Sequence, residues 1–243
     1  MTVQVLQSRS GINLARQELR RLGLSHTSPA LARWLRRLGR KLGFPVGITV
    51  GDVIKSWDVL TTAQFIQERV AVATPILDIG AYASEILCVL HRLQYSALTG
   101  VDLNPALQQM PYSKAIRYQV SDFMDTPFPK ETFGVITAIS VIEHGFQSQP
   151  LLKEIARLLK PGGYFIASFD YWPEKVDTTG IDIFGMDWRI FSSTEVLDFL
   201  DEAQTYALRP CGTIELHAET PTMFWSGKPY TFAWLALQKR SSA

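Results

Sequence analysis

The chain has 243 residues, of which 47% are hydrophobic and 19% are charged. This composition excludes an intrinsically disordered chain and predicts one ordinary domain, or one domain with an appended subdomain, around a large apolar core. The net charge of +1 argues against a general binder of polyanions.

Cysteine usage and hydropathy point to a location. The two cysteines, Cys88 and Cys211, lie far apart in the sequence and predict no disulfide framework. The N-terminus lacks the charged and then apolar pattern of a secretory signal. No apolar run approaches the roughly 18 residues that span a bilayer. We therefore expect a cytoplasmic protein without a membrane span.

Helical spacing of apolar residues dominates the first third of the chain. Residues 10–42 show this spacing, and a further helix is predicted to begin at Ser56 or Thr61 and to end at Val70. This part of the chain therefore looks all-helical. We expect residues 1–70 to form an N-terminal helical cap or lid over the remainder.

The same segment is strongly basic, because Glu18 is the one acid among the basic residues from Arg9 to Lys41. A basic amphipathic stretch can contact nucleic acid or a membrane surface. Such a block most often forms the solvated face of a helix. We therefore do not expect nucleic acid as a partner.

From Pro75 onward, short apolar runs alternate with helical stretches. This alternation indicates βαβ units and an α/β fold, with a doubly wound, mostly parallel, seven-stranded Rossmann-like sheet over residues 71–243. The last two strands have no helix-length segment between them, so the last strand is expected to run antiparallel. The predicted strands are residues 76–79, 97–103, 116–120, 135–139, 164–169, 213–216 and 232–237, and the predicted helices are residues 84–93, 150–159 and 194–203.

Acidic residues end three successive predicted strands, at Asp78, Asp102 and Asp122. In an open parallel sheet, ligands bind outside the carboxyl ends of the strands, and Gly80 would let the backbone approach a ligand closely. The alternative is that each acid caps the helix that follows it. An acid that ends the second strand can accept hydrogen bonds from both ribose hydroxyls of a nucleotide. Because the full Gly-x-Gly-x-x-Gly loop is absent, the sequence favours an adenosine without a diphosphate.

Two further motifs follow in order. Residues 140–144 read Ser-Val-Ile-Glu-His at the end of the fourth predicted strand, and residues 159–163 read Leu-Lys-Pro-Gly-Gly before the fifth. Together with the Asp-x-Gly turn at Asp78, these motifs resemble the class I S-adenosylmethionine-dependent methyltransferases, and more narrowly the methyltransferase type 11-like group. The resemblance covers residues 75–169 and implies S-adenosyl-L-methionine as the cofactor.

The resemblance also implies a role for each residue that matches the motifs of the family. The residues so implied are Asp78 and Gly80 for the methionine amino end, Asp102 for the ribose, Leu103, Asp122 and Phe123 for the adenine, and Ser140, through its backbone, for the methionine portion.

The chain departs from the family pattern in the first loop. The family often continues this loop as Asp-x-Gly-x-Gly-x-Gly, whereas Tyr82 and Ser84 stand at the positions of the later glycines. Tyr82 could cover the cofactor, and the Ser84 hydroxyl could bind its carboxylate. Equally, the two larger side chains could obstruct the site, which leaves open a non-catalytic module that kept the fold.

Methyl transfer from a sulfonium is an in-line displacement, in which the enzyme mainly aligns the reacting atoms. A hydroxyl acceptor also needs a base. His144 is the first candidate, because the ordinary pKa of histidine suits this task, although it could instead order its loop. Glu143 could orient His144, Asp170 at the end of the fifth strand is the second candidate, and His217 is the third. We expect no metal.

Two long segments, residues 171–191 and 217–230, carry aromatic side chains that could form a small-molecule pocket or seal the edge of the sheet. Trp57 or Phe65 of the cap is expected to touch the cofactor. We favour a hydroxyl acceptor, such as a sugar or secondary metabolite, with nitrogen as the alternative. A methyltransferase acting on nucleic acid is disfavoured because the fourth strand lacks the Asn/Asp-Pro-Pro-aromatic pattern. A nicotinamide dehydrogenase is disfavoured because the pyrophosphate loop is missing.

Overall fold

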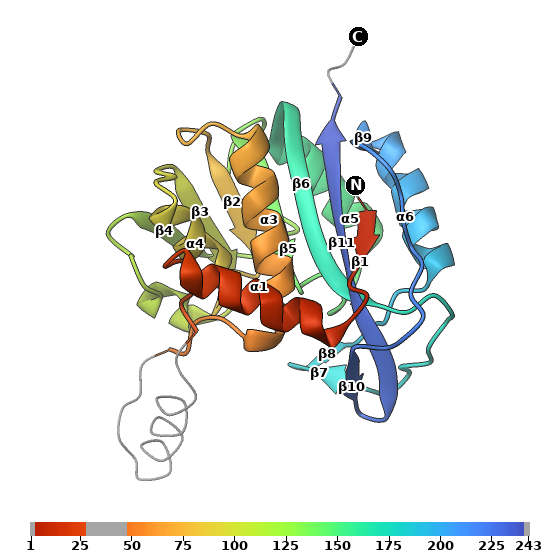
Figure 1. Cartoon of the computed structure of the whole chain (residues 1–243). Coiled ribbons are helices and arrows are strands. Elements are labelled where there is room, and N and C mark those ends of the chain that lie inside the picture. Colours follow the sequence, from red (N-terminus) through yellow and green to blue (C-terminus); the bar gives the residue numbers. More distant parts are fainter. Residues whose placement is uncertain (1–2, 28–47, 241–243) are drawn as a thin grey trace.

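The structure is a computed structural model that describes residues 3–27 and 48–240. Part of the predicted helical segment 10–42, together with most of its basic residues, lies outside these ranges. In the described part, a twisted central sheet has helices on both of its faces (Figure 1).

Strand order confirms the predicted fold class. Across the main sheet the order is β1-β11-β6-β5-β2-β3-β4, and β9 and β10 also pair with β11, so that this sheet has nine strands in the described residues rather than the predicted seven. Strands β2 to β6 pair in parallel, and β11 runs antiparallel to β6. The bounds are β1 Val3–Val5, β2 Ile76–Ile79, β3 Leu98–Asp102, β4 Ile116–Val120, β5 Phe133–Ile139, β6 Leu159–Tyr171, β9 Leu208–Pro210, β10 Met223–Trp225 and β11 Lys228–Lys239.

The two faces of the sheet carry separate apolar cores. In β11, Leu235 and Leu237 pack toward α5 and α6, whereas Trp234 and Ala236 pack toward α3 and α4, as the alternation of a strand requires. The helices are α1 Arg9–Arg21, α3 Ser56–Arg69, α4 Ile86–Arg92, α5 Ser148–Leu158 and α6 Ser193–Thr205, with short 3₁₀ turns η1 Val53–Lys55 and η2 Pro105–Gln109.

The first third of the chain is not all-helical, which corrects the sequence expectation. Strand β1 pairs antiparallel with β11, with Val3 opposite Leu235. Val3 and Val5 are buried, whereas Gln4 is half-buried, so three residues with a period of two extend the sheet. Because β1 occupies this edge, the predicted strand 213–216 does not form, and Ile214 makes only an isolated bridge to Val3.

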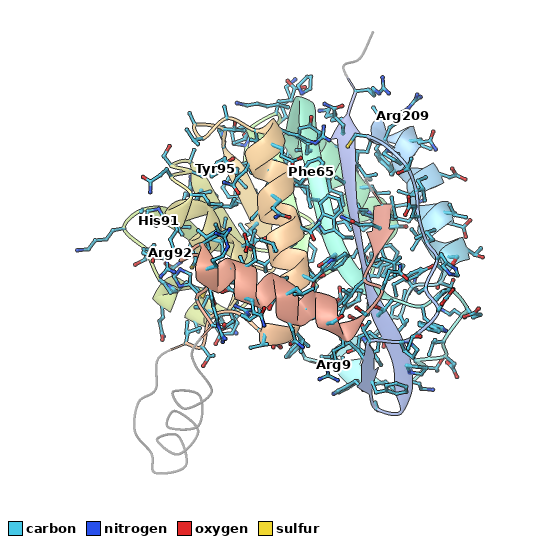
Figure 2. The ribbon with its side chains drawn as sticks, viewed as in Figure 1. Arg9, Phe65, His91, Arg92, Tyr95 and Arg209 are labelled. Carbon is cyan, nitrogen blue, oxygen red and sulfur yellow. The ribbon has the colours of Figure 1, made fainter. Side chains whose placement is uncertain are left out.

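Phe65 also lies away from its expected place. Its ring packs against the rings of Trp234 and Tyr164, with centroid distances of 5.4 and 5.3 Å. Phe65 therefore belongs to the core between α3 and the sheet, and it does not reach the carboxyl ends of the strands (Figure 2).

A buried ion pair joins the N-terminal segment to the rest of the molecule. Arg16 on α1 and Glu85 just before α4 are both buried, and Nη1 of Arg16 lies 3.3 Å from Oε1 of Glu85. Arg16 also donates to Oγ of Ser56 at 2.8 Å and to the carbonyl oxygen of Asp52 at 3.1 Å. Glu85 in turn accepts from the backbone N–H of Thr27 at 3.2 Å. The pair thus joins four separate segments of the chain.

Neighbouring contacts tighten the same junction. The backbone N–H of Gly51 donates to the carbonyl of Ala83, in the loop after β2, at 2.9 Å. At the other end of α4, the Arg92 guanidinium donates to the carbonyls of Gly23 and Ser25, at 2.8 and 3.2 Å, and lies beside the end of α1 (Figure 2). The N-terminal segment therefore contacts both the loop after β2 and the helix that follows it.

Replacement of Glu85 by Gln should destabilise the protein severely. The guanidinium of Arg16 would remain buried without its counter-charge, and breaking a buried pair in this way costs about 3 to 5 kcal/mol in the free energy of unfolding. Urea denaturation of the wild type and Glu85→Gln measures this difference. Glu18→Gln, which removes the exposed pair with Arg21, is the matched control and should leave the midpoint unchanged. Equal midpoints for Glu85→Gln and Glu18→Gln would contradict the proposed role of the buried pair.

Candidate active site

The backbone turns sharply after β2, at Gly80, which has φ of +70°. A Cβ atom at this position would lie 2.4 Å from Cγ2 of Val141, in the segment after β5. Glycine is therefore required both by the left-handed backbone and by the close approach of two strand ends. Ala83 in the same loop has φ of +60°, which is uncommon for a residue with a side chain.

Asp78 lies beneath this turn and is fully buried. Oγ1 of Thr137 donates to its Oδ1 at 2.6 Å, and Oδ2 has no hydrogen-bond partner in the described protein. Burial raises the pKa of Asp78 to about 7, although hydrogen bonds from Thr137 and Ser84 act in the opposite direction. Asp78 is thus tied to the neighbouring strand β5 through Thr137, and its interaction with Ser84 reaches the loop after β2.

The acids that end β3 and β4 both bind backbone N–H groups. Oδ2 of Asp102 accepts from the N–H of Tyr82 at 2.9 Å, and Oδ1 accepts from Asn104 at 2.8 Å. Oδ1 of Asp122 accepts from the N–H of Met124 at 2.9 Å. Each carboxylate therefore stabilises a local turn, and Asp102 also ties the loop after β2 to the end of β3.

These residues lie along one edge of the sheet. Because β4, β3, β2 and β5 are adjacent in this order, their carboxyl ends bring together Asp122, Asp102, Gly80 and Ser140. Ser140 has φ of +55°, and its buried Oγ has no hydrogen-bond partner in the described protein. The residues next to the acids differ in exposure: the Leu103 side chain is 61% exposed, whereas Phe123 and Tyr82 are half-buried against the core.

A second group of polar side chains is buried at the ends of β5 and β6. Asp170 lies next to the last residue of β6. Its Oδ1 lies 3.4 Å from Nζ of Lys55, while its Oδ2 accepts from Nε1 of Trp188 at 2.8 Å. Glu143 and Asp58 are buried nearby, and Oε2 of Glu143 and both carboxyl oxygens of Asp58 have no hydrogen-bond partner in the described protein. We call Lys55, Asp58, Glu143 and Asp170 the buried polar cluster.

Burial and mutual repulsion shift the pKa values in this cluster. Burial raises the pKa of Asp58 to about 7, against the attraction of Lys55. Burial, and then the charge of Asp170, also raise the pKa of Glu143. Burial lowers the pKa of Lys55, but the carboxylates around it raise that pKa by more. Burial thus favours the protonated forms of Asp58 and Glu143, which lie near the ammonium group of Lys55.

Two of the candidate bases from the sequence have different surroundings. His144 lies next to Glu143 at the edge of the cluster, its Nδ1 is buried without a partner, and burial lowers its pKa. Its ring packs edge-on against Phe184 at 5.6 Å. The side chain of His217 is 77% exposed and pairs with Glu219 at 3.3 Å, so this third candidate lies outside the buried cluster.

Sequence reasoning missed Lys55 and Asp58 as members of the site. They lie in the N-terminal segment, 115 residues before Asp170 in the case of Lys55, and no motif marks them. The one available signal was a run of polar residues on the inner face of α3, since Ser56, Asp58 and Thr62 are all buried there.

A cavity of about 430 Å³ is lined in part by Trp188, whose indole also donates to Asp170 of this cluster. It lies under the segment between β6 and α6, which contains the small hairpin β7 Asp182–Ile183 and β8 Met186–Asp187. The predicted pocket segment 171–191 therefore has structure of its own. Its lining residues are Gly145, Phe146, Gln147, Lys175, Asp177, Thr178, Thr179, Gly180, Asp187, Trp188 and Arg189.

Neither a metal-binding cluster nor a membrane-spanning helix is present in the described ranges. No cluster of three or more His, Cys, Asp or Glu side chains within residues 3–27 and 48–240 is arranged to hold a metal ion. None of the helices described there has the length and apolar character needed to cross a bilayer.

Replacement of Asp58 by Asn should stabilise the protein in a pH-dependent way. The pKa of Asp58 is raised on folding, so the wild type loses stability as pH rises from about 4 to 7, at about 1.4 kcal/mol for each unit of pKa shift. Asp58→Asn avoids this loss, and its advantage should grow across that window and stay constant above it. Urea denaturation at a series of pH values measures the difference, with exposed Asp201→Asn as the control. A difference that does not vary with pH would exclude a buried, protonated Asp58.

Comparison with known proteins identifies the domain. Residues 77–167 match the family model of the methyltransferase domain. The chain is 30% identical over 93 residues to cycloartenol-C-24-methyltransferase of Arabidopsis thaliana, covering 38% of this chain and 27% of that protein. It is also 30% identical over 95 residues to demethylmenaquinone methyltransferase of Tropheryma whipplei, covering 37% and 39%. The aligned part thus spans well under half the length of these curated relatives.

Solved structures share the fold. Geranyl diphosphate C-methyltransferase of Streptomyces coelicolor superposes with a TM-score of 0.56 at 17% identity, covering 74% of this chain and 78% of that chain. The [4+2]-cyclase SpnF has the same TM-score at 14% identity and covers 99% of both chains. At this level of identity the likeness establishes the fold. With the sequence match, it follows that the chain contains a methyltransferase domain, and that it has the class I fold of the S-adenosylmethionine-dependent methyltransferases.

Proposed function

We propose that this protein transfers a methyl group from S-adenosyl-L-methionine to a hydroxyl oxygen of a small-molecule acceptor. The observation that carries this proposal is the position of the buried polar cluster beside the sheet edge formed by Gly80, Asp102, Asp122 and Ser140. One end of the sheet can therefore hold an adenosine and offer groups that accept a proton. The cofactor supplies the methyl group, bound to a positively charged sulfur.

The residues along the edge fit the shape and chemistry of this cofactor. Asp102 uses one lone pair of each oxygen on a backbone N–H, and a carboxylate has further lone pairs for ribose hydroxyls. Exposed Leu103 offers an apolar surface to one face of an adenine. Asp122 and Phe123 would contact the adenine from β4.

The loop after β2 would hold the methionine portion. Gly80 keeps the backbone free of a side chain there, and the unpartnered Oγ of Ser140 lies at the same edge. Asp78 lies beneath the loop and is held by Thr137 of β5. Tyr82 and Ser84 belong to the loop itself: the N–H of Tyr82 is held by Asp102, and the Ser84 hydroxyl is turned toward Asp78. These contacts support the reading in which the two larger residues shape the site and do not block it.

On the acceptor side, a hydroxyl must lose its proton as the new bond forms. Asp170 and His144 are the two candidates for this base, and buried Glu143 precedes His144 in the chain and is influenced by the charge of Asp170. The aromatic rings of Trp188, Trp225 and Tyr230 pack together on this side, with centroid distances of 5.0 Å from Trp188 to Trp225 and 5.6 Å from Trp188 to Tyr230. Such a wall suits an acceptor that is apolar except for its reacting group.

A carbon acceptor is the second candidate, because two of the similar proteins are named as C-methyltransferases. The aligned region is too short to carry that chemistry over to this chain, and the fold also occurs in a protein named as a cyclase. A nitrogen acceptor remains the alternative from the sequence.

Calorimetric titration should show binding of S-adenosylmethionine and S-adenosylhomocysteine, and no binding of NAD, because the chain lacks a pyrophosphate loop. Asp102→Ala should weaken binding of both ligands at least about tenfold, through loss of the ribose contacts and of the support for the loop. Asp201→Ala, an exposed change on α6, is the matched control and should leave the affinity unchanged. A folded wild type that binds neither ligand would overturn the proposal and favour a non-catalytic module.

A further inference from the structure

Among the residues that the structure describes, Lys55 is the only one that contributes an ammonium group to the buried polar cluster. We propose that Lys55 is a positioning residue, which keeps Asp170 charged and oriented so that Asp170 takes the proton of the acceptor hydroxyl. This inference rests on the proposed function, and it adds a residue from outside the matched domain to the site.

The geometry fixes the Asp170 carboxylate from two sides. Nζ of Lys55 lies 3.4 Å from Oδ1, and Nε1 of Trp188 donates to Oδ2 at 2.8 Å. Lys55 is itself held, because its Nζ lies 3.6 Å from the centroid of the Phe232 ring. Each oxygen of Asp170 therefore has one partner and retains lone pairs for a further hydrogen bond.

Four other titratable groups face this pair: Asp58 from α3, Glu143 and His144 from the segment after β5, and Tyr230 from β11. One ammonium group can balance one buried carboxylate. Of the three carboxyl groups, Asp170 is the one in ion-pair contact with Lys55. Asp58 and Glu143 have raised pKa values and unpartnered oxygens, so they retain their protons more readily.

His144 is less suited to the role of base. A general base histidine needs its second ring nitrogen held by a partner that fixes the ring. Nδ1 of His144 is buried and has no such partner in the described protein. The backbone of the same segment is instead held by the loop before α6, since Glu143 and Gly145 pair with Arg189 and Asp187. His144 therefore orders the loop beside the acceptor.

The step balances with Asp170 as base. The proton of the acceptor hydroxyl passes to a carboxylate oxygen of Asp170 while the hydroxyl oxygen forms a bond to the methyl carbon. The bond between that carbon and sulfur breaks, and its electron pair remains on sulfur and neutralises the sulfonium charge.

The indole N–H of Trp188 gives a direct probe, because it donates to Asp170. Proton–nitrogen NMR spectra of the full chain would follow this signal over a pH series, with its assignment made by Trp188→Phe. Trp234 serves as an internal control, since its indole donates to Thr62 and not to a carboxylate. The variants are Lys55→Met, Lys55→Arg and, as a matched surface control, Lys153→Met.

In Lys55→Met, the pH at which the Trp188 signal moves should rise by about one to three units, since an adjacent opposite charge stabilises a carboxylate by that much. Lys55→Arg should restore the wild-type profile, and Lys153→Met and the Trp234 signal should not change. If the indole signal of Trp188 has the same pH dependence in Lys55→Met and in the wild type, the inference is overturned. Near-UV circular dichroism checks that Lys55→Met keeps its packing. If Lys55→Met misfolds, the same pH series is compared between Lys55→Arg, which keeps the positive charge, and Lys55→Gln, which removes it.

Methyl transfer to acceptors of the wild type provides the second readout. Asp170→Asn should lower kcat at least about 100-fold, as for loss of a general base, with unchanged affinity for S-adenosylmethionine, whereas His144→Ala should lose less than about tenfold. A larger loss of kcat in His144→Ala than in Asp170→Asn would overturn the assignment of Asp170 as the base. Calorimetry with S-adenosylmethionine separates the two proposals: if the wild type does not bind it, the proposed function fails, while the NMR series still decides whether Lys55 controls Asp170.

Discussion

The buried pair of Arg16 and Glu85 is the contact on which the arrangement of the site depends. Burying two charges is costly unless further hydrogen bonds satisfy them, and here Ser56, the Asp52 carbonyl and the Thr27 N–H supply those bonds. The pair holds α1 and the start of α3 against the segment that leads from the loop after β2 into α4. Because η1 lies within this junction, the position of Lys55 over the end of β6 follows from the same contact.

The carboxyl groups at the carboxyl ends of the strands fall into two kinds, those that stabilise turns and those that are buried. Asp102 and Asp122 accept from backbone N–H groups and shape turns, whereas the 3₁₀ turn η2 after β3 is capped by Asn104 and not by Asp102. Asp58, Asp78 and Glu143 are buried, and their pKa values are raised. The difference comes from desolvation, which favours the protonated form of these buried groups and outweighs the attraction of Lys55 for Asp58 and Glu143. Asp170 is the carboxyl group in ion-pair contact with Lys55.

Local patterns predicted much of the sheet. The strands Ile76–Ile79 and Ile116–Val120 have the predicted bounds, because a short apolar run between turn residues has few other ways to be buried. The glycine turn was also predictable, since its left-handed backbone and the collision with Val141 both require glycine. The N-terminal strand was missed because three residues with a period of two carry little signal, and the strand expected at residues 213–216 was lost because that N-terminal strand occupies the edge it needed.

The sequence by itself determined the class of fold, the order of the sheet strands along the chain and the acids at their ends, since these follow from the period of apolar residues and from turn chemistry within a few positions of each residue. Only the tertiary structure decided which distant groups meet. Lys55 and Asp58 join Glu143 and Asp170 through the packing of α3 on the sheet, and Phe65 is turned into the core by that same packing. Such contacts depend on the relative position of whole elements, and no local pattern in the chain encodes them.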